Sequence, residues 1–265
     1  MNLITNPYYI QSIHEGWQAK LKLHQTENGL LLEKMYGKNL KWTHRDANNI
    51  LIAISCYTGW LQKNGVSIVK TKFSICSFDK TDWFVLTYQP FIGLNCEQII
   101  YSLLRSNSYS EAVVLYRKLL KLACNLSWKP FPPYYRCEIK PRDFCMDNTM
   151  NVFFVDTFPP VLARINGKII CANKHLKKAC IIKRDAMEIL DVTGSAEGVI
   201  RNLYEHTVAI FPEKHSLFRD ETINVTFSIN HKLGEAIQKR LMCNESIQKI
   251  SLLHKYFLKR IPYGD

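Results

Sequence analysis

Three carboxylates and a lysine flank a short stretch in the middle of the chain that has the pattern of a β-hairpin. Two apolar segments, 144–146 and 152–155, are separated by a polar turn, which predicts two short antiparallel strands. The side chains at its ends are Glu138, Lys140, Asp143 and Asp156. Carboxylates at the ends of adjacent strands can hold a hard cation such as Mg²⁺ or accept a proton. Alternatively, they are ordinary turn carboxylates.

This stretch resembles the catalytic loop of the kinase-like superfamily, nearest to small-molecule kinases of the aminoglycoside phosphotransferase and choline kinase type. Their loop reads H-x-D-x-x-x-x-N, often with Pro two residues before the Asn, and a second Asp closes a strand some dozen residues later. The spacing matches here, with Pro141 in place. The letters differ at four points: Arg136 stands for His, Glu138 for the base Asp, Asp143 for the metal-binding Asn, and Thr157-Phe158 for Phe-Gly after Asp156.

The resemblance implies a role for each of these residues. Glu138 would accept the proton of the attacking hydroxyl, and Lys140 would pair with the γ-phosphate of ATP. Asp143 and Asp156 would hold Mg²⁺, and Asp in place of Asn should tighten metal binding. Glu in place of Asp displaces the base by one methylene, and ~1 Å of misplacement can slow catalysis by ~10²-fold.

The same resemblance assigns a nucleotide site to the N-terminal part. Lys34 ends the apolar run 30–32 and stands where the family has its phosphate-binding lysine, although a surface strand lysine fits the pattern too, and Lys20 and Lys22 compete for the role. The family's phosphate loop would be the stretch 12–16, with Gly16 as its one glycine. The adenine hinge would lie at 88–91, with Tyr88 and Gln89 as contacts, and aromatic residues there equally suit a core. The helix glutamate of the family has no clear match; Asp46 and Asn49 are the nearest.

The first 93 residues read as a five-stranded sheet with one helix. Alternation, turn residues and the Asn28-Gly29 pair predict the strands, while Thr43 as cap and Gly65 as stop predict the helix. The strands are expected at 8–13, 17–23, 30–36, 72–78 and 83–88, and the helix at 43–64.

The chain from residue 94 to 265 is predicted to be mostly helical. Helix is expected over 96–126, interrupted at 106–110, and over most of 183–260 with a break at Pro212. The catalytic hairpin occupies 136–160. Strands in one block and helices in the next predict an α+β protein with two lobes. The resemblance implies that these have the kinase-like arrangement, with a nucleotide-binding N-lobe (1–93) and a larger C-lobe (94–265).

Composition excludes several classes of protein. Of 265 residues, 47% are hydrophobic and 22% charged, which is typical of a folded globular chain rather than a disordered one. Nine cysteines are scattered without CxxC pairs, so reduced thiols in the cytoplasm are expected. No signal peptide or membrane-spanning segment is predicted. The net charge of +12 favours anionic partners, but no nucleic-acid-binding motif accompanies it.

The resemblance to the kinase-like superfamily therefore implies an ATP- and Mg²⁺-dependent phosphotransferase acting on a hydroxyl of a small molecule. Asp185, Glu188 and Asp191 share one face of an expected helix and could bind a cationic acceptor, or form a solvated face. The first alternative is a degenerate kinase that binds nucleotide or a protein partner without catalysis. A basic nucleic-acid-binding or toxin-like protein is the second.

Overall fold

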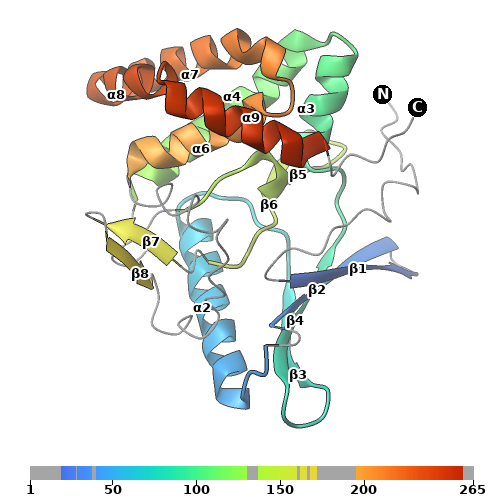
Figure 1. Ribbon diagram of the computed structural model, residues 1–265. Coiled ribbons are helices and arrows are strands. Elements are labelled where there is room, and N and C mark those ends of the chain that lie inside the picture. Colours follow the sequence, from blue (N-terminus) through green and yellow to red (C-terminus); the bar gives the residue numbers. More distant parts are fainter. Residues whose placement is uncertain are drawn as a thin grey trace.

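The computed structural model describes residues 19–27, 29–37, 40–129, 137–159, 162–165, 168–171 and 195–258. An antiparallel sheet with one helix comes first and a helical part follows, so the predicted α+β, two-lobed architecture is confirmed (Figure 1). The elements are β1 (Ala19–Thr26), β2 (Gly29–Tyr36), α2 (His44–Lys63), β3 (Lys72–Ser77), β4 (Trp83–Pro90), α3 (Cys96–Arg105), α4 (Tyr109–Ser127), η1 (Pro141–Asp143), β5 (Phe144–Met146), β6 (Val152–Phe154), β7 (Leu162–Ile165), β8 (Lys168–Cys171), α6 (Ala196–Val208), η3 (Pro212–Lys214), α7 (His215–Ile229), α8 (His231–Leu241) and α9 (Asn244–Leu258). None of the helices in these ranges combines the length and the apolar character that a bilayer crossing requires.

The N-terminal sheet has the strand order β1-β2-β4-β3, with antiparallel neighbours throughout. Gly29 closes the β1–β2 hairpin at φ 109°, a conformation that favours glycine, and this confirms the turn predicted from the Asn-Gly pair. The predicted strand 8–13 lies outside the described residues, which is why four strands rather than five are described here.

Helix α2 begins and ends as its sequence predicts. The Thr43 side chain accepts a hydrogen bond from the Asp46 amide, and the Asp46 carboxylate accepts one from the Thr43 amide, forming a capping box. Its buried face packs on one side of the sheet, against Tyr36 and Val85, while its last turns, with Tyr57 and Leu61, join the core of the helical part. One helix therefore contributes to both hydrophobic cores.

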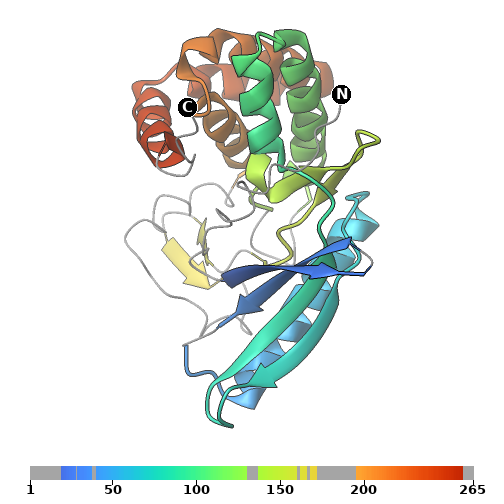
Figure 2. The same ribbon diagram turned by 90° about the vertical axis from the view of Figure 1, so that its right-hand side faces the viewer.

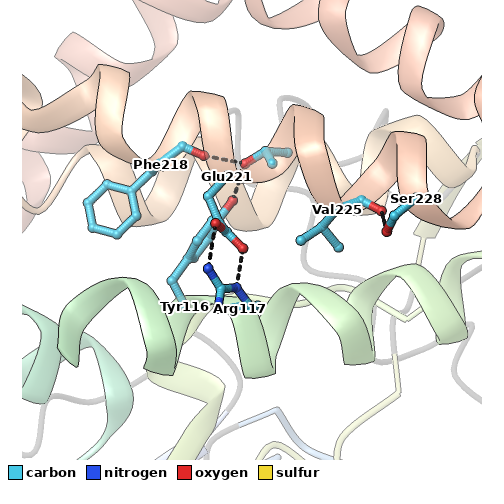
Figure 3. A network of polar contacts seen from close by, with 7 residues as sticks. Tyr116, Arg117, Phe218, Glu221, Val225 and Ser228 are labelled. Carbon is cyan, nitrogen blue, oxygen red and sulfur yellow. Dashed lines mark hydrogen bonds and ion pairs between the residues drawn. The ribbon is translucent and has the colours of Figure 1, made fainter. Parts of the chain in front are cut away.

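The helical part is built around α6, whose residues 196–208 are buried with the exception of Glu197. Helices α4, α7, α8 and α9 pack around it (Figure 1). Polar contacts join α4 to α7: the Arg117 guanidinium donates two hydrogen bonds to Glu221, and the hydroxyls of Tyr116 and Thr222 lie 2.6 Å apart (Figure 3).

The hairpin formed by β5 and β6 lies between the sheet and the helices (Figures 1 and 2). The Phe154 amide donates to the Ser67 carbonyl (2.8 Å), in the segment after α2, and the Met146 amide donates to the Leu94 carbonyl (3.2 Å), in the segment before α3. Both predicted strands of this hairpin are confirmed. A second hairpin, β7–β8, was not predicted.

Gly93, in the segment that leads from the sheet to α3, should not tolerate a side chain. Its φ of 152° favours glycine, and a Cβ there would meet the Met146 carbonyl oxygen of the hairpin. We expect Gly93→Ala to lower the free energy of unfolding by about 1–3 kcal/mol, measured by urea denaturation. The matched control is Gly59→Ala, in the exposed face of α2, where nothing lies within 4 Å and alanine should stabilise the helix by up to about 1 kcal/mol. Equal effects at the two positions would contradict this interpretation.

Candidate functional site

The segment before β5 fixes the position of Asp143. Pro141 opens the short helix η1, and the Asp143 carboxylate accepts a hydrogen bond from the Lys140 amide (3.0 Å). The Asp143 carbonyl in turn accepts from the Val155 amide (2.8 Å), which extends the β5–β6 ladder by one pair. Asp143 and Asp156, 13 residues apart in sequence, thus lie beside each other at the end of the hairpin.

Lys34 reaches this end of the hairpin from the sheet. Its side chain is buried, and the ammonium group donates a hydrogen bond to the Val155 carbonyl. Burial lowers the pKa of Lys34, and the negative charge of Asp156, followed by smaller effects of Cys145 and Asp143, opposes this shift. The structure therefore brings Lys34 together with the two aspartates that the sequence predicted as metal ligands.

Glu138 and Lys140 stand beside these residues as an ion pair. Lys140 is buried and Glu138 is half-buried. The intervening Ile139 has a buried side chain, and its carbonyl accepts a hydrogen bond from Asn202 of α6 (3.0 Å). Because the central helix holds the backbone between them, the two charged side chains project from a fixed segment.

The carboxylates of the site lie close enough to disturb one another. Burial, with a further contribution from Asp156, raises the pKa of Asp143 to about 7, although Lys140 opposes the shift. Partial burial and the charge of Glu138 raise the pKa of Asp156, while Lys34 and Lys140 lower it. Arg142 also lowers the pKa of Asp143, so three cationic side chains, Lys34, Lys140 and Arg142, face the three carboxylates.

The chemistry of the two neighbouring aspartates fits a bound cation. Within the described residues no group of three or more His, Cys, Asp or Glu side chains could hold a metal ion by itself. Two carboxylates are, however, the protein share that Mg²⁺ commonly uses, with water and phosphate oxygens completing its shell. Asp143 and Asp156 suit such a site.

Asp156 is anchored by the residues that follow it. Its carboxylate accepts a hydrogen bond from the Phe158 amide (3.3 Å), and the Phe158 ring stacks on Tyr36 of β2 with ring centroids 5.0 Å apart. Phe158 belongs to the hydrophobic core between the sheet and α2. The dipeptide Thr157-Phe158 differs from the Phe-Gly of the family motif. The Phe158 ring nevertheless connects Asp156 to the sheet by stacking on Tyr36.

Other predicted residues have different positions. Asp46 caps α2 and Lys22 is exposed on β1, in register with Glu33 rather than Lys34, so neither takes the role considered for it. Tyr88 bonds to Glu33 on the face of the sheet opposite to Lys34, whereas Gln89 shares the Lys34 face. Four predicted residues lie outside the described ranges: Gly16, Asp185, Glu188 and Asp191.

Comparisons with known proteins give structural likenesses only. No protein-family model and no curated protein matches the sequence. The chain is similar to the solved structure of WaaP in complex with acyl carrier protein, with 9% identity, a TM-score of 0.39, and 89% and 87% of the two chains covered. It is also similar to a Toxoplasma gondii rhoptry antigen kinase domain, with 10% identity, a TM-score of 0.43, and 93% and 82% covered. At these scores the likenesses carry no argument about function, so the kinase-like interpretation rests on the element order and on the residues gathered at the hairpin.

Asp143 should make the folded protein less stable as the pH rises. Its folded-state pKa of about 7 lies above the unfolded value near 4, so stability falls between these pH values as the buried carboxyl must ionise. Asp143→Asn retains an oxygen for the Lys140 amide but removes the charge. We expect this variant to exceed the wild type in unfolding free energy by about 1–3 kcal/mol near pH 8, and by nothing near pH 4, in urea denaturation.

Asp147, in the turn of the same hairpin, is the matched control. Its carboxylate accepts hydrogen bonds from Thr149 and Asn151, which lower its pKa, so its ionised form stabilises the fold. Asp147→Asn should therefore destabilise the protein near pH 7. A loss of stability near pH 8 in Asp143→Asn as well would show that the Asp143 carboxylate is adequately compensated.

Proposed function

We propose that this protein is an ATP- and Mg²⁺-dependent phosphotransferase that acts on a hydroxyl group of a small molecule. The observation that carries the proposal is the meeting of Lys34 with Asp143 and Asp156, from elements more than 100 residues apart in sequence, in one partly buried cluster. A lysine can bind the phosphates, and two neighbouring carboxylates can bind the cation that accompanies them.

Each group has a part in the proposed reaction. Lys34 binds the phosphate chain, and Asp143 and Asp156 hold the cation, which would neutralise charge on the β- and γ-phosphates. The acceptor's hydroxyl oxygen forms a bond to the γ-phosphorus, the bond from that phosphorus to the bridging oxygen breaks, and ADP leaves. Glu138 takes the hydroxyl proton, while Lys140, already paired with Glu138, adds positive charge beside the transferred group.

A degenerate kinase that binds nucleotide without transfer is the second candidate, because of the surroundings of Lys34. Over the described residues, the side chains that α2 buries against the sheet are apolar: Ala47, Ile50, Ala53 and Ile54. Helix α2 therefore presents no carboxylate to Lys34 from this face, and Glu138 stands where the family has its shorter base. Both features would impair transfer more than nucleotide binding.

Thermal shift with and without Mg²⁺ separates these candidates from a general polyanion binder. Mg²⁺-dependent stabilisation by ATP supports a nucleotide site, and phosphate transfer or slow ATP hydrolysis would then distinguish an enzyme from a degenerate kinase. If any polyanion stabilises the protein, and this stabilisation disappears when salt is added, the nucleic-acid-binding alternative is supported instead. A cationic acceptor, recognised by the acidic residues at 185, 188 and 191, stays a prediction.

Asp156→Asn should abolish Mg²⁺-dependent ATP binding more completely than Glu138→Gln. Asp156 would be a direct ligand of the cation, so replacing its charge with a nearly isosteric amide should weaken Mg²⁺–ATP binding by at least about 10-fold. Glu138 would touch the acceptor hydroxyl, so Glu138→Gln should leave ATP affinity nearly unchanged and reduce turnover by about 10²–10⁴-fold. Calorimetric titration of both variants gives the comparison. Equal Mg²⁺–ATP affinity in wild type and Asp156→Asn would remove Asp156 from the site.

Lys34→Ala should weaken ATP binding while leaving the fold intact. The lysine would supply positive charge to the phosphates from a fixed strand, and its loss should reduce affinity by about 10-fold or more. Lys22→Ala is the matched control, because Lys22 is exposed on the neighbouring strand and lies away from Asp156. Circular dichroism checks the fold and calorimetry the affinity. If both alanine variants bind ATP as the wild type does, the phosphate contact lies elsewhere.

A further inference from the structure

Large apolar side chains gather on the surface near the end of the described chain. Eleven such side chains are exposed among the described residues, and five of them lie within residues 242–258: Met242, Ile247, Leu252, Tyr256 and Leu258. Met242 and Ile247 are the most exposed of the eleven, at 63% and 60%. Single apolar residues on a surface are ordinary, but a cluster of them indicates an interaction site.

Four of the five belong to the outer face of α9. Residues 247, 251 and 255 form one row along this helix and residues 248, 252 and 256 the next, because positions four apart lie one above the other. All six are exposed, and so is residue 258. These seven residues form the outer face, and none of them is a carboxylate. In both views α9 lies on the outside of the helical part (Figures 1 and 2).

The inner face of α9 already anchors the helix to the fold. The buried Phe257 ring packs edge-on against Tyr101 of α3, with ring centroids 5.6 Å apart. On α6, Glu205 accepts a hydrogen bond from the Ser246 hydroxyl (2.7 Å) and forms an ion pair with Lys249 (2.7 Å). The apolar side chains of the outer face are therefore not needed to hold α9 in place, and exposing them to water is unfavourable.

Cationic side chains accompany this apolar surface. Lys239 and Arg240 are exposed in the last turn of α8, just before Met242, and Lys255 lies within the outer face. None of these three cations forms an ion pair within the part of the chain that the structure describes. Residues 239–258 carry four cationic side chains and one carboxylate, in a chain with a net charge of +12. The combination suits a partner that offers both anionic groups and hydrocarbon.

We propose that the outer face of α9 binds the surface of a membrane that contains anionic phospholipids. The helix lies flat on this surface, with its apolar side chains at the boundary between headgroups and acyl chains. Lys255 of the outer face and the cationic end of α8 contact the lipid phosphates. Tyr256 suits the headgroup level, because its ring is apolar and its hydroxyl is polar.

Other occupants fit this face less well. A second copy of the chain would bring lysines against lysines, since the outer face offers no carboxylate to pair with them. An acidic protein would match the charge, but Ile247 and Tyr256 are nine residues apart and therefore about 180° apart around the helix axis. A fluid headgroup layer can surround so convex a face, whereas a protein would need a groove that encloses half of the helix.

The test is cosedimentation of the full chain with vesicles of phosphatidylcholine, alone or mixed with phosphatidylglycerol. We expect at least about 10-fold stronger binding to the mixed vesicles, and weaker binding to them when salt is added. Ile247→Gln combined with Leu252→Gln should reduce binding to mixed vesicles by about 10-fold or more. Ile52→Gln combined with Val114→Gln is the matched control, since it changes exposed apolar side chains on α2 and α4, and it should bind as the wild type does.

A pair of charge variants separates this face from the overall charge of the protein. Lys239→Glu combined with Arg240→Glu should weaken binding to mixed vesicles by about 10-fold or more. Lys70→Glu combined with Lys72→Glu gives the same net charge at exposed positions near the start of β3 and should retain most of the binding. Equal losses in the two variants would show that net charge, rather than this face, attracts the lipid, and would overturn the proposal.

Urea denaturation should give all four variants the midpoint of the wild type, because every changed side chain is exposed. If the wild type does not bind mixed vesicles, or if the Ile247→Gln, Leu252→Gln variant binds them as the wild type does, the proposal is wrong. Binding to polyglutamate but not to vesicles, lost in the same variant, would assign the face to an acidic protein. A dimer that this variant dissociates in sedimentation equilibrium, without vesicle binding, would assign it to a second copy. Either result would overturn the proposal.

Discussion

A buried lysine that crosses from the sheet to the hairpin is the contact on which the site depends. The Lys34 ammonium group donates to the Val155 carbonyl and lies near the negative charge of Asp156. A buried ammonium group is unfavourable unless it is paired and hydrogen-bonded, so β2 and the end of β6 must stay at hydrogen-bonding distance. This contact therefore fixes Lys34 against the hairpin, while the packing of α2 in both cores also holds the sheet and the helical part together.

Apolar packing and backbone bonds hold the two sides of this contact. Phe158 inserts into the core between the sheet and α2, and Asn202 ties the segment before the hairpin to the central helix α6. The hairpin bonds at Ser67 and Leu94 to the two segments that connect the sheet with the helices. A small movement between the two parts would disturb all of these bonds together, which explains how two three-residue strands can carry a defined site.

Much of this arrangement could be predicted from the sequence because local signals and pairing agree. The capping box at Thr43 and the turn at Gly29 are local, and alternation identified β2 and therefore the strand position of Lys34. What could not be predicted depends on contacts between distant residues. The bond from Asn202 to Ile139 joins residues 63 positions apart.

The family motif specifies residue types, whereas the structure around Asp156 depends on where an aromatic side chain lies. Thr157-Phe158 differs from the family dipeptide, yet the Phe158 ring holds Asp156 against Tyr36, since stacking needs an aromatic ring near the strand and not a particular order of letters. The β7–β8 hairpin was missed because its strands are four residues long and alternation over so short a run is weak.

The residues of the cluster are positioned more firmly for nucleotide binding than for phosphate transfer, the two parts of the proposed function. The proposed nucleotide side draws on two separate parts of the fold: Lys34 on β2, and the aspartate pair at the end of the β5–β6 hairpin, where the Val155 amide donates to the Asp143 carbonyl. The transfer side depends on Glu138 alone, on an extended segment and already engaged with Lys140. Glutamate has one more rotatable bond than aspartate, so placing its carboxylate costs more conformational entropy. Under the proposed function, the replacement at this position bears on the rate of transfer, whereas Lys34 and the two aspartates bear on the binding of Mg²⁺ and its nucleotide. Under the proposed function, nucleotide binding would persist where transfer has weakened, because different residues would limit the two.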